Sequence, residues 1–291
     1  MSQRFDCTDP AQLEEGLLEA QAALRRGDLV VLPTDTVYGI AAEAFDPVAV
    51  DRLLAAKGRG RDMPPPVLVG TVRAAVALIQ ELGEMGKDLI DEFWPGPLTL
   101  VFRSSPTLVW DIGESKGTVA VRMPLHAVAL GLLKKTGPLA VSSANYSGQP
   151  PATTADEAAA QLGDSVAVYL DGGPCSGDVP STIVDLTGSV PKLLRPGVIP
   201  PDRIREIVPL VDGDAFGPDP AEREDPAIPD ETSTPDISAD TSADTSADGT
   251  DGAPGKVAGV PGEAGESGGV AASELTADHN GGAPEAPGQV L

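Results

Sequence analysis

Polar side chains follow short apolar segments at several places in this 291-residue sequence, which is how an open α/β sheet usually builds a binding site. In the motif PTDTVYG (residues 33–39), Thr34 and Thr36 come directly after the apolar segment 29–33. Their hydroxyls can bind a small polar substrate. Threonines in turns also commonly bond only to nearby backbone, so the motif by itself leaves both interpretations open.

A cluster of cations follows in KGRGR (residues 57–61), where Lys57, Arg59 and Arg61 alternate with two glycines. Guanidinium groups match phosphate oxygens as forked donors and lysine adds a point charge, so the segment can clamp a polyphosphate. A solvated helix end would have the same composition. The spacing differs from GxxxxGK followed by Ser or Thr, so the segment is not a P-loop.

The motif VSSANYSG (residues 141–148) leads from an apolar strand into a loop of small polar residues. Its backbone N–H groups and the hydroxyls of Ser142, Ser143 and Ser147 can bind a nucleotide, although an Asx or Ser/Thr turn uses the same residues. We expect no covalent nucleophile. Ser143 would need a base, and His126, the only histidine in residues 1–212, falls in a predicted amphipathic helix.

Two late motifs, PSTIVD (residues 180–185) and LRPG (residues 194–197), place polar residues at strand ends. Ser181 and Thr182 begin one predicted strand, and Arg195 follows the next. An arginine at this place can bind an anion across the sheet edge, but a lone arginine at a strand end is more often part of a surface ion pair.

The elements that must position these residues alternate between helices and strands. Asp9 and Asp46, each followed by proline, predict two helix starts, and WPGPLTL (residues 94–100) predicts a rigid connection. The pattern predicts helices over residues 10–26, 47–57, 72–82, 88–93, 125–135 and 154–161, and strands over residues 29–33, 67–70, 98–102, 118–121, 139–141, 166–170, 182–186 and 192–194. It indicates an α/β domain with a mixed sheet, because the last strands are joined by turns too short for a helical crossover.

Charge and composition divide the chain near residue 212. Residues 213–291 contain 17 acidic and 2 basic residues, a net charge of −15, with Phe216 as the only aromatic and the repeat TSADTSAD at residues 241–248. Such a segment buries too little apolar area to offset chain entropy, so we predict a disordered acidic tail. Residues 1–212, the predicted folded domain, keep 27 acidic and 18 basic residues, a net charge of −9.

Several classes of protein are disfavoured. No apolar segment reaches the roughly 18 residues of a membrane helix and the N-terminus lacks a signal-peptide layout, so we expect a cytoplasmic protein without membrane contact. Cys7, Cys175, His126 and His279 are too few for a zinc cluster or a disulfide framework, and both cysteines are expected to be ordinary thiols. The total net charge of −24 argues against binding nucleic acid through net charge.

Seven motifs in a fixed order are more specific than any one of them. Across residues 10–210 the chain resembles the YrdC/Sua5 family of L-threonylcarbamoyladenylate synthases in PTDTVYG, the K-x-R of Lys57 and Arg59, WPGPLT, VAVRMP (residues 119–124), SSANYSG, PSTIVD and LRPG. The resemblance implies a twisted sheet of mixed parallel and antiparallel strands, with flanking helices, around a concave and positively charged cavity. It also implies a nucleotidyltransferase that makes L-threonylcarbamoyl-AMP and pyrophosphate from L-threonine, bicarbonate and ATP. This is the first step of N6-threonylcarbamoyladenosine formation in tRNA.

The resemblance also implies roles for particular residues. Thr34, Arg122 and Ser181 would bind L-threonine, with Arg122 holding its carboxylate through a bidentate fork. The positions that would serve ATP are Lys57, Arg59, Thr118, Ser143, Asn145 and Arg195, and Arg61 is added only for its charge. Mg²⁺ would enter with ATP, and the product would pass to a tRNA threonylcarbamoyl transferase complex.

The sequence departs from the family pattern at two places. Leu68, in MPPPVLVG (residues 63–70), stands where many relatives have a histidine, and a leucine cannot make a histidine's polar contact. Longer relatives carry a second folded domain after a linker, and this chain has the acidic segment there.

Two other functions stay open from the sequence. A non-catalytic module for double-stranded RNA or tRNA would use the same concave surface. The net charge of −9 and the lack of interleaved aromatics disfavour this module but leave weak RNA binding open. A carbamoyl-transfer maturation domain has this fold in larger proteins, but its companion zinc-finger and transferase modules are not found in this sequence.

Overall fold

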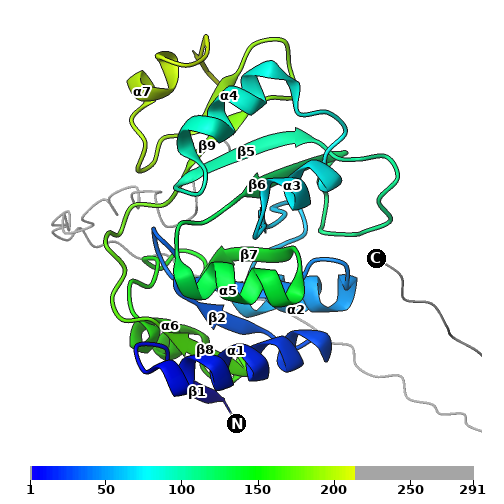
Figure 1. The fold of residues 1–291 in the computed structure, drawn as a ribbon. Coiled ribbons are helices and arrows are strands. Elements are labelled where there is room, and N and C mark those ends of the chain that lie inside the picture. The colour runs from blue at the N-terminus through cyan, green and yellow to red at the C-terminus, as the bar shows by residue number, and fades with distance from the viewer. Residues whose placement is uncertain (1, 214–291) are drawn as a thin grey trace, which may run out of the picture. The chain divides into compact units, whose positions relative to one another are not determined.

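The computed structural model describes residues 2–213, whose arrangement Figure 1 shows. From residue 214 onward, the predicted tail lies outside the described residues, so the division of the chain near residue 212 stays a prediction. Within the described part of the chain, no helix combines the length and apolar character needed to cross a bilayer.

A mixed sheet of 11 strands runs through the described residues in the order β1-β8-β2-β3-β7-β4-β6-β5-β9-β10-β11. Strand pairs such as β1 with β8 and β4 with β6 are parallel, and pairs such as β2 with β3 and β5 with β6 are antiparallel. The strands are β1 (Gln3–Asp6), β2 (Val30–Leu32), β3 (Gly39–Glu43), β4 (Val67–Leu68), β5 (Leu98–Arg103), β6 (Thr118–Arg122), β7 (Leu139–Ser143), β8 (Val168–Asp171), β9 (Thr182–Asp185), β10 (Lys192–Arg195) and β11 (Val211–Asp212). The predicted mixed α/β fold is confirmed.

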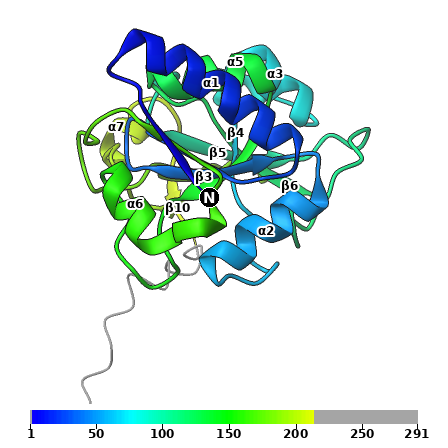
Figure 2. The same ribbon diagram turned by 90° about the horizontal axis from the view of Figure 1, so that it is seen from below.

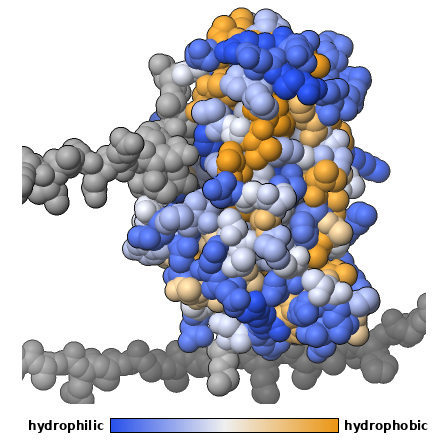
Figure 3. Space-filling model, turned by 90° about the vertical axis from the view of Figure 1, so that its left-hand side faces the viewer, coloured by the Kyte–Doolittle hydropathy of each residue, from blue (hydrophilic) through white to orange (hydrophobic). Residues whose placement is uncertain are grey.

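Helices pack on both faces of the sheet. They are α1 (Pro10–Arg25), α2 (Pro47–Lys57), α3 (Val72–Leu78), α4 (Gly83–Phe93), α5 (Ala127–Thr136), α6 (Ala155–Leu162) and α7 (Pro201–Arg205), with a short 3₁₀ turn at Gly163–Ser165. Figure 2 shows α1 and α5 on one side of the sheet and α2 and α6 on the other. On the face shown in Figure 3, apolar areas lie among larger hydrophilic ones.

Strand β2 is buried on both faces, as its apolar sequence predicts. Val30 and Leu32 pack in the core beneath α1 and α5, while Val31 packs in the core beneath α2 and α6. All three side chains are fully buried, which stabilises the fold by about 1.5–3 kcal/mol for each side chain. The residues that follow β2 therefore leave a rigid element.

Aspartate caps begin the first two helices, as predicted. Asp9 Oδ1 accepts from Ala11 N–H at 2.8 Å, and Asp46 Oδ1 accepts from Val48 N–H at 2.9 Å. Helix α2 ends at Gly58, whose left-handed φ of 65° suits a residue without Cβ. The end of α2 therefore fixes where the cationic segment 57–61 begins.

Some elements differ from the prediction. Strands β1, β3 and β11 and helix α7 were not predicted. In β3, Ile40 alone is a typical strand former beside one glycine and two alanines, and the strand forms because it pairs with β2 on one edge and β7 on the other. Pairing with β2 and β7 therefore outweighs the weak strand preference of these residues.

Three predicted helices have other bounds. The helix predicted over residues 72–82 ends at Leu78, because Ile79 is extended and bridges to Ser104. Helix α4 begins at Gly83, five residues before its predicted start at residue 88. Helix α5 begins at Ala127, so His126 is the residue before the helix and not part of an amphipathic face.

Candidate active site

A cavity of about 350 Å³ lies over the middle of the sheet, where β7, β4, β6, β5 and β9 are consecutive neighbours. Among the described residues, the polar side chains of its lining are two guanidinium groups, four hydroxyls and one carboxylate, from Arg59, Arg195, Thr36, Ser142, Ser143, Ser181 and Asp178. The charged side chains in the lining therefore leave a positive balance, which suits an anionic ligand such as a polyphosphate.

Thr34 is buried beside Thr36 at one end of the site. Its hydroxyl donates to the carbonyl of Val37 at 2.6 Å and accepts from Thr36 N–H at 3.2 Å, and the two threonine hydroxyls are 3.0 Å apart. Of these two threonines, Thr36 lines the cavity. The local backbone bonding that the sequence left open is present, and the contact of Thr34 with L-threonine stays a prediction.

Arg122, at the end of β6, is held by three different groups. Its Nε donates to the carbonyl of Gly96 at 3.0 Å, one terminal nitrogen donates to Thr36 Oγ1 at 3.1 Å, and the other pairs with Asp35 Oδ1 at 2.6 Å. Burial lowers the pKa of Arg122, and the charge and hydrogen bond of Asp35 oppose that shift. The guanidinium carries five N–H groups, so its two terminal nitrogens each have one N–H beyond these bonds. Arg122 is buried and is not among the described residues that line the cavity.

Asp35 was missed as a site residue, although it stands between the two threonines of the PTDTVYG motif. Its Oδ1 also accepts from Leu125 N–H at 3.0 Å, but its Oδ2 is a buried atom without a partner. Among the described residues, Nδ1 of His126 is the other buried side-chain nitrogen or oxygen atom without a hydrogen-bond partner. Both residues line a second cavity of about 480 Å³, together with Thr34 and Cys175.

Ser181 and Arg195 contact each other in the lining of the main cavity. Nε and one terminal nitrogen of Arg195 donate to the carbonyl of Ser181 at 3.2 and 2.8 Å, and Ser181 Oγ lies 2.8 Å from Thr99 Oγ1. The two motifs approach closely at Gly197, where a Cβ would lie 2.5 Å from the carbonyl of Pro180. The predicted threonine ligand Ser181 and the predicted nucleotide ligand Arg195 are therefore direct neighbours.

Lys57 is fully buried at the end of α2 and contacts the loop after β7. Its Nζ donates to the carbonyl and Oδ1 of Asn145 at 2.8 and 3.2 Å, and to the carbonyl of Ser143. These contacts join the cationic segment to the SSAN motif. Contact of Lys57 with phosphates stays a prediction, and its visible role is to hold the loop that presents Ser143.

Arg59 and Asn145 complete this wall of the site. Nε of Arg59 donates to Ser147 Oγ at 3.0 Å and a terminal nitrogen donates to Ser142 Oγ at 3.4 Å. Nδ2 of Asn145 donates to the carbonyl of Gln149 at 2.7 Å, which closes the loop. Arg59 lines the cavity, and Asn145 is buried below it as a loop organiser.

The described residues that line the main cavity do not include Thr118 or Arg61, nor the predicted residues Thr34, Arg122, Lys57 and Asn145. Thr118 begins β6 and donates to the carbonyl of Ser115 at 2.8 Å. The guanidinium of Arg61 is partly exposed and pairs with Asp51 and Asp111. The charge of Arg61 was the only reason to include it, and carboxylates outside the site balance that charge.

Leu68 lines the main cavity and is buried, with 5% of its surface exposed. Val101, Ala120 and Ile183 add to the same apolar wall. The wall of the cavity is therefore apolar at Leu68.

The two cysteines are free thiols within the described chain. Burial raises the pKa of Cys7 to about 11 and also raises that of Cys175, whose Sγ donates to the carbonyl of Thr34 at 3.4 Å. Neither thiol is activated as a nucleophile at neutral pH, in keeping with the expectation of ordinary thiols.

A sequence model of the protein family Sua5/YciO/YrdC, described as "Telomere recombination", matches residues 22–197. The chain belongs to this family. The match covers the segments that carry every predicted site residue, from Thr34 to Arg195.

Known members of the Sua5/YciO/YrdC family are similar along most of the described chain. A Mycobacterium tuberculosis protein named "Putative threonylcarbamoyl-AMP synthase" is 52% identical over 217 residues, which cover 75% of this chain and 100% of that protein. The threonylcarbamoyl-AMP synthase of Pyrococcus abyssi is 40% identical over 199 residues, which cover 68% of this chain and 58% of that protein. The crystal structure of P. abyssi Sua5 complexed with L-threonine superposes with a TM-score of 0.64 at 36% identity, covering 72% of this chain and 62% of that one. This chain thus spans less than two thirds of the Pyrococcus protein.

Proposed function

We propose that this chain is a threonylcarbamoyl-AMP synthase, a nucleotidyltransferase that converts L-threonine, bicarbonate and ATP into L-threonylcarbamoyl-AMP and pyrophosphate. The observation that carries the proposal is the 52% identity over the full length of the M. tuberculosis relative, whose name states this activity. The cationic cavity of this chain supports it, because a triphosphate needs such a lining. The L-threonine complex of the P. abyssi neighbour supports the choice of amino acid.

The proposed reaction needs no nucleophile from the protein. The deprotonated amine of L-threonine takes up the carbon of bicarbonate to form a carbamate with loss of water. A carbamate oxygen then attacks the α-phosphorus of ATP, and the bond to the β-phosphate oxygen breaks to release pyrophosphate. The protein contributes positioning and stabilisation of negative charge.

Each group of cavity residues has a proposed part in this reaction. Arg59 and Arg195 hold the polyphosphate and the developing pyrophosphate. Thr34, Ser181 and the remaining N–H groups of Arg122 hold L-threonine, with Ser181 from the lining of the main cavity and Thr34 from that of the second cavity. Ser143 contacts the nucleotide from the loop that Lys57 organises.

Mg²⁺ is proposed as part of the ATP substrate. The described residues include no group of three or more His, Cys, Asp or Glu side chains that could hold a metal ion. When it enters with ATP, Mg²⁺ would neutralise phosphate charge.

Pyrophosphate release by the purified full-length chain tests the proposal. The assay contains ATP, bicarbonate and Mg²⁺, with L-threonine, L-serine or no amino acid. We expect release that depends on L-threonine and is lost in Arg122→Ala and strongly reduced in Ser181→Ala. Circular dichroism of both variants shows whether they are folded. Ser181→Ala keeps the test valid if removal of Arg122 leaves the Asp35 carboxylate buried without its counter-charge and unfolds the domain.

A folded chain that releases no pyrophosphate under any condition would contradict the proposal. Salt-sensitive binding of tRNA without ATP binding would instead favour the non-catalytic RNA module. Transfer of the product to a tRNA threonylcarbamoyl transferase complex belongs to the same proposal, and it follows because an adenylated carbamate is an activated group that needs an acceptor. A cytoplasmic location stays a prediction.

A further inference from the structure

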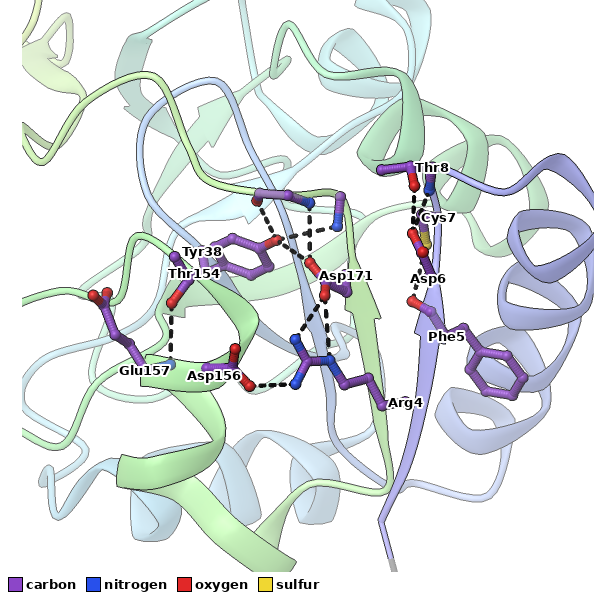
Figure 4. Close-up of polar contacts among 12 residues, drawn as sticks. Arg4, Phe5, Asp6, Cys7, Thr8, Tyr38, Thr154, Asp156, Glu157 and Asp171 are labelled. Atoms are coloured by element: carbon purple, nitrogen blue, oxygen red, sulfur yellow. Dashed lines mark hydrogen bonds and ion pairs between the residues drawn. The ribbon is translucent and has the colours of Figure 1, made fainter.

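A tyrosine hydroxyl lies buried beside the threonine side of the site. Tyr38 directly precedes β3 and is fully buried. Its hydroxyl donates to the carbonyl of Gly173 at 2.6 Å and accepts from Gly172 N–H at 3.1 Å. Both glycines belong to the turn after β8, so one side chain binds this turn at two points, as Figure 4 shows.

Asp171, at the end of β8, also forms a hydrogen bond with this turn. Its Oδ1 accepts from Gly173 N–H at 3.0 Å and lies 3.3 Å from the Tyr38 hydroxyl. Its Oδ2 accepts from Arg4 of β1 at 2.7 Å, and Arg4 also pairs with Asp156 of α6 (Figure 4). Tyr38 and Asp171 therefore bond to the turn, and Arg4 links Asp171 to β1 and α6.

The turn packs closely against residues on either side of the threonine site. A Cβ on Gly172 would lie 2.7 Å from Cγ of Pro33 and 3.2 Å from Cε1 of His126. Gly173 has a φ of +80°, which residues with a Cβ rarely adopt. The position of the turn is thus coupled to the start of the PTDTVYG motif.

Contacts continue from the turn to the predicted threonine ligands. Cys175, two residues after Gly173, donates its Sγ–H to the carbonyl of Thr34 at 3.4 Å. Thr34 Oγ1 lies 3.0 Å from Thr36 Oγ1, which in turn accepts from Arg122 at 3.1 Å. A continuous series of contacts therefore joins the Tyr38 hydroxyl to Thr34 and Arg122.

We propose that Tyr38 is a positioning residue for L-threonine, whose hydroxyl holds the Gly172–Gly173 turn so that Thr34 and Arg122 keep their geometry. The proposal rests on the proposed synthase function. It is specific to one substrate, because the residues that line the ATP side, such as Arg59 and Ser143, are held from α2 and the loop after β7. Burial raises the pKa of Tyr38, so the hydroxyl stays protonated at neutral pH.

Two tyrosine variants separate this role from a general loss of stability. Tyr38→Phe removes only the hydroxyl. Tyr169→Phe is the matched control, because Tyr169 of β8 is also buried and donates its hydroxyl to a glycine carbonyl, that of Gly163, at 2.7 Å outside both cavities. Pyrophosphate release is measured with each substrate varied in turn, and L-threonine binding is measured by calorimetry.

We expect Tyr38→Phe to raise KM and Kd for L-threonine about tenfold, because both hydrogen bonds from the hydroxyl to the turn are lost, and to change KM for ATP and kcat by less than about twofold. Tyr169→Phe should leave both KM values within about twofold of the wild type. Asp171→Asn, which weakens the same turn, should raise KM for L-threonine in the same direction. Its effect should not be additive with that of Tyr38→Phe, because both act on one turn.

The outcomes distinguish this proposal from the synthase proposal. If the wild type is active and Tyr38→Phe has an unchanged KM for L-threonine, the positioning role is overturned and the synthase function is not. Equal losses for ATP and L-threonine, or equal effects in Tyr169→Phe, would also overturn it. A wild type without threonine-dependent release would contradict the synthase function, and the calorimetric Kd would then decide the role of Tyr38. If Tyr38→Phe does not fold, Asp171→Asn supplies the same comparison.

Discussion

Neighbouring cations in this chain have different surroundings. Arg59 lines the cavity and bonds to Ser142 and Ser147, whereas Arg61, two residues later, pairs with carboxylates outside it. From the sequence alone, both arginines could bind phosphate, since both guanidinium groups belong to the glycine-containing segment 57–61. Asp51 and Asp111 lie near Arg61 in the fold and pair with its guanidinium outside the cavity.

We therefore predict different effects for two matched substitutions. Arg59→Ala should lower kcat/KM for ATP by about 100-fold, because a preorganised cation contributes about 2–4 kcal/mol to the transition state. Arg61→Ala should change kcat/KM by less than about threefold, because exposed ion pairs contribute little. Steady-state pyrophosphate release measures both. Equal losses in the two variants would show that Arg61 also reaches the substrate.

At the scale of elements, α2 connects the fold to the site. Asp46 caps its first turn, Lys57 ends it with a buried cation, and Gly58 turns the chain toward Arg59. The helix stabilises itself through its caps and also sets the starting point of the cationic loop. Changes at its two ends should therefore have different consequences.

Asp46→Ala should lower the free energy of unfolding by about 1 kcal/mol and leave the KM for ATP nearly unchanged, because it removes only a cap. Gly58→Ala should cost a similar amount and also raise the KM for ATP severalfold. The reason is that its φ of +65° is strained for alanine and its Cβ would lie 2.5 Å from the Tyr146 hydroxyl. Urea unfolding and steady-state kinetics measure the pair. An unchanged KM in Gly58→Ala would show that the loop adjusts without moving Arg59.

At the scale of the whole molecule, charge is unevenly placed. Residues 1–212 carry a net charge of −9, yet the described residues that line the cavity include two guanidinium groups and one carboxylate. A local positive site within an acidic surface favours small anionic substrates over long polyanions, which repulsion from the surrounding surface disfavours. This balance supports ATP over nucleic acid as the main ligand of the cavity.

Removal of residues 214–291 should leave kcat/KM and the melting temperature nearly unchanged, because their composition cannot form a core. The cut belongs after Gly213, since β11 pairs with β10 and Gly213 N–H donates to the carbonyl of Leu193 at 3.0 Å. Calorimetry and the pyrophosphate assay check this. A fall in melting temperature of more than about 3 °C, roughly 1 kcal/mol for a domain of this size, would show that the removed segment contributes to the fold.

The sequence by itself determined the features that depend on near neighbours. Asp9 and Asp46 mark the starts of α1 and α2, because a capping carboxylate acts on N–H groups two residues away. The apolar segment that becomes β2 and the ordered set of motifs were also visible, since each is a local pattern. These patterns were enough to predict the mixed α/β fold and the family.

The tertiary structure alone decided what depends on distant partners. Strand β3 forms because β2 and β7 pair with both of its edges, in spite of its weak strand preference. Asp35 neutralises Arg122 from 87 positions away in sequence, and the hydroxyl of Tyr38 reaches a turn more than 130 residues later. Hydrogen bonds and ion pairs act only over a few ångströms, so folding determines which of these groups meet and which cation faces the cavity.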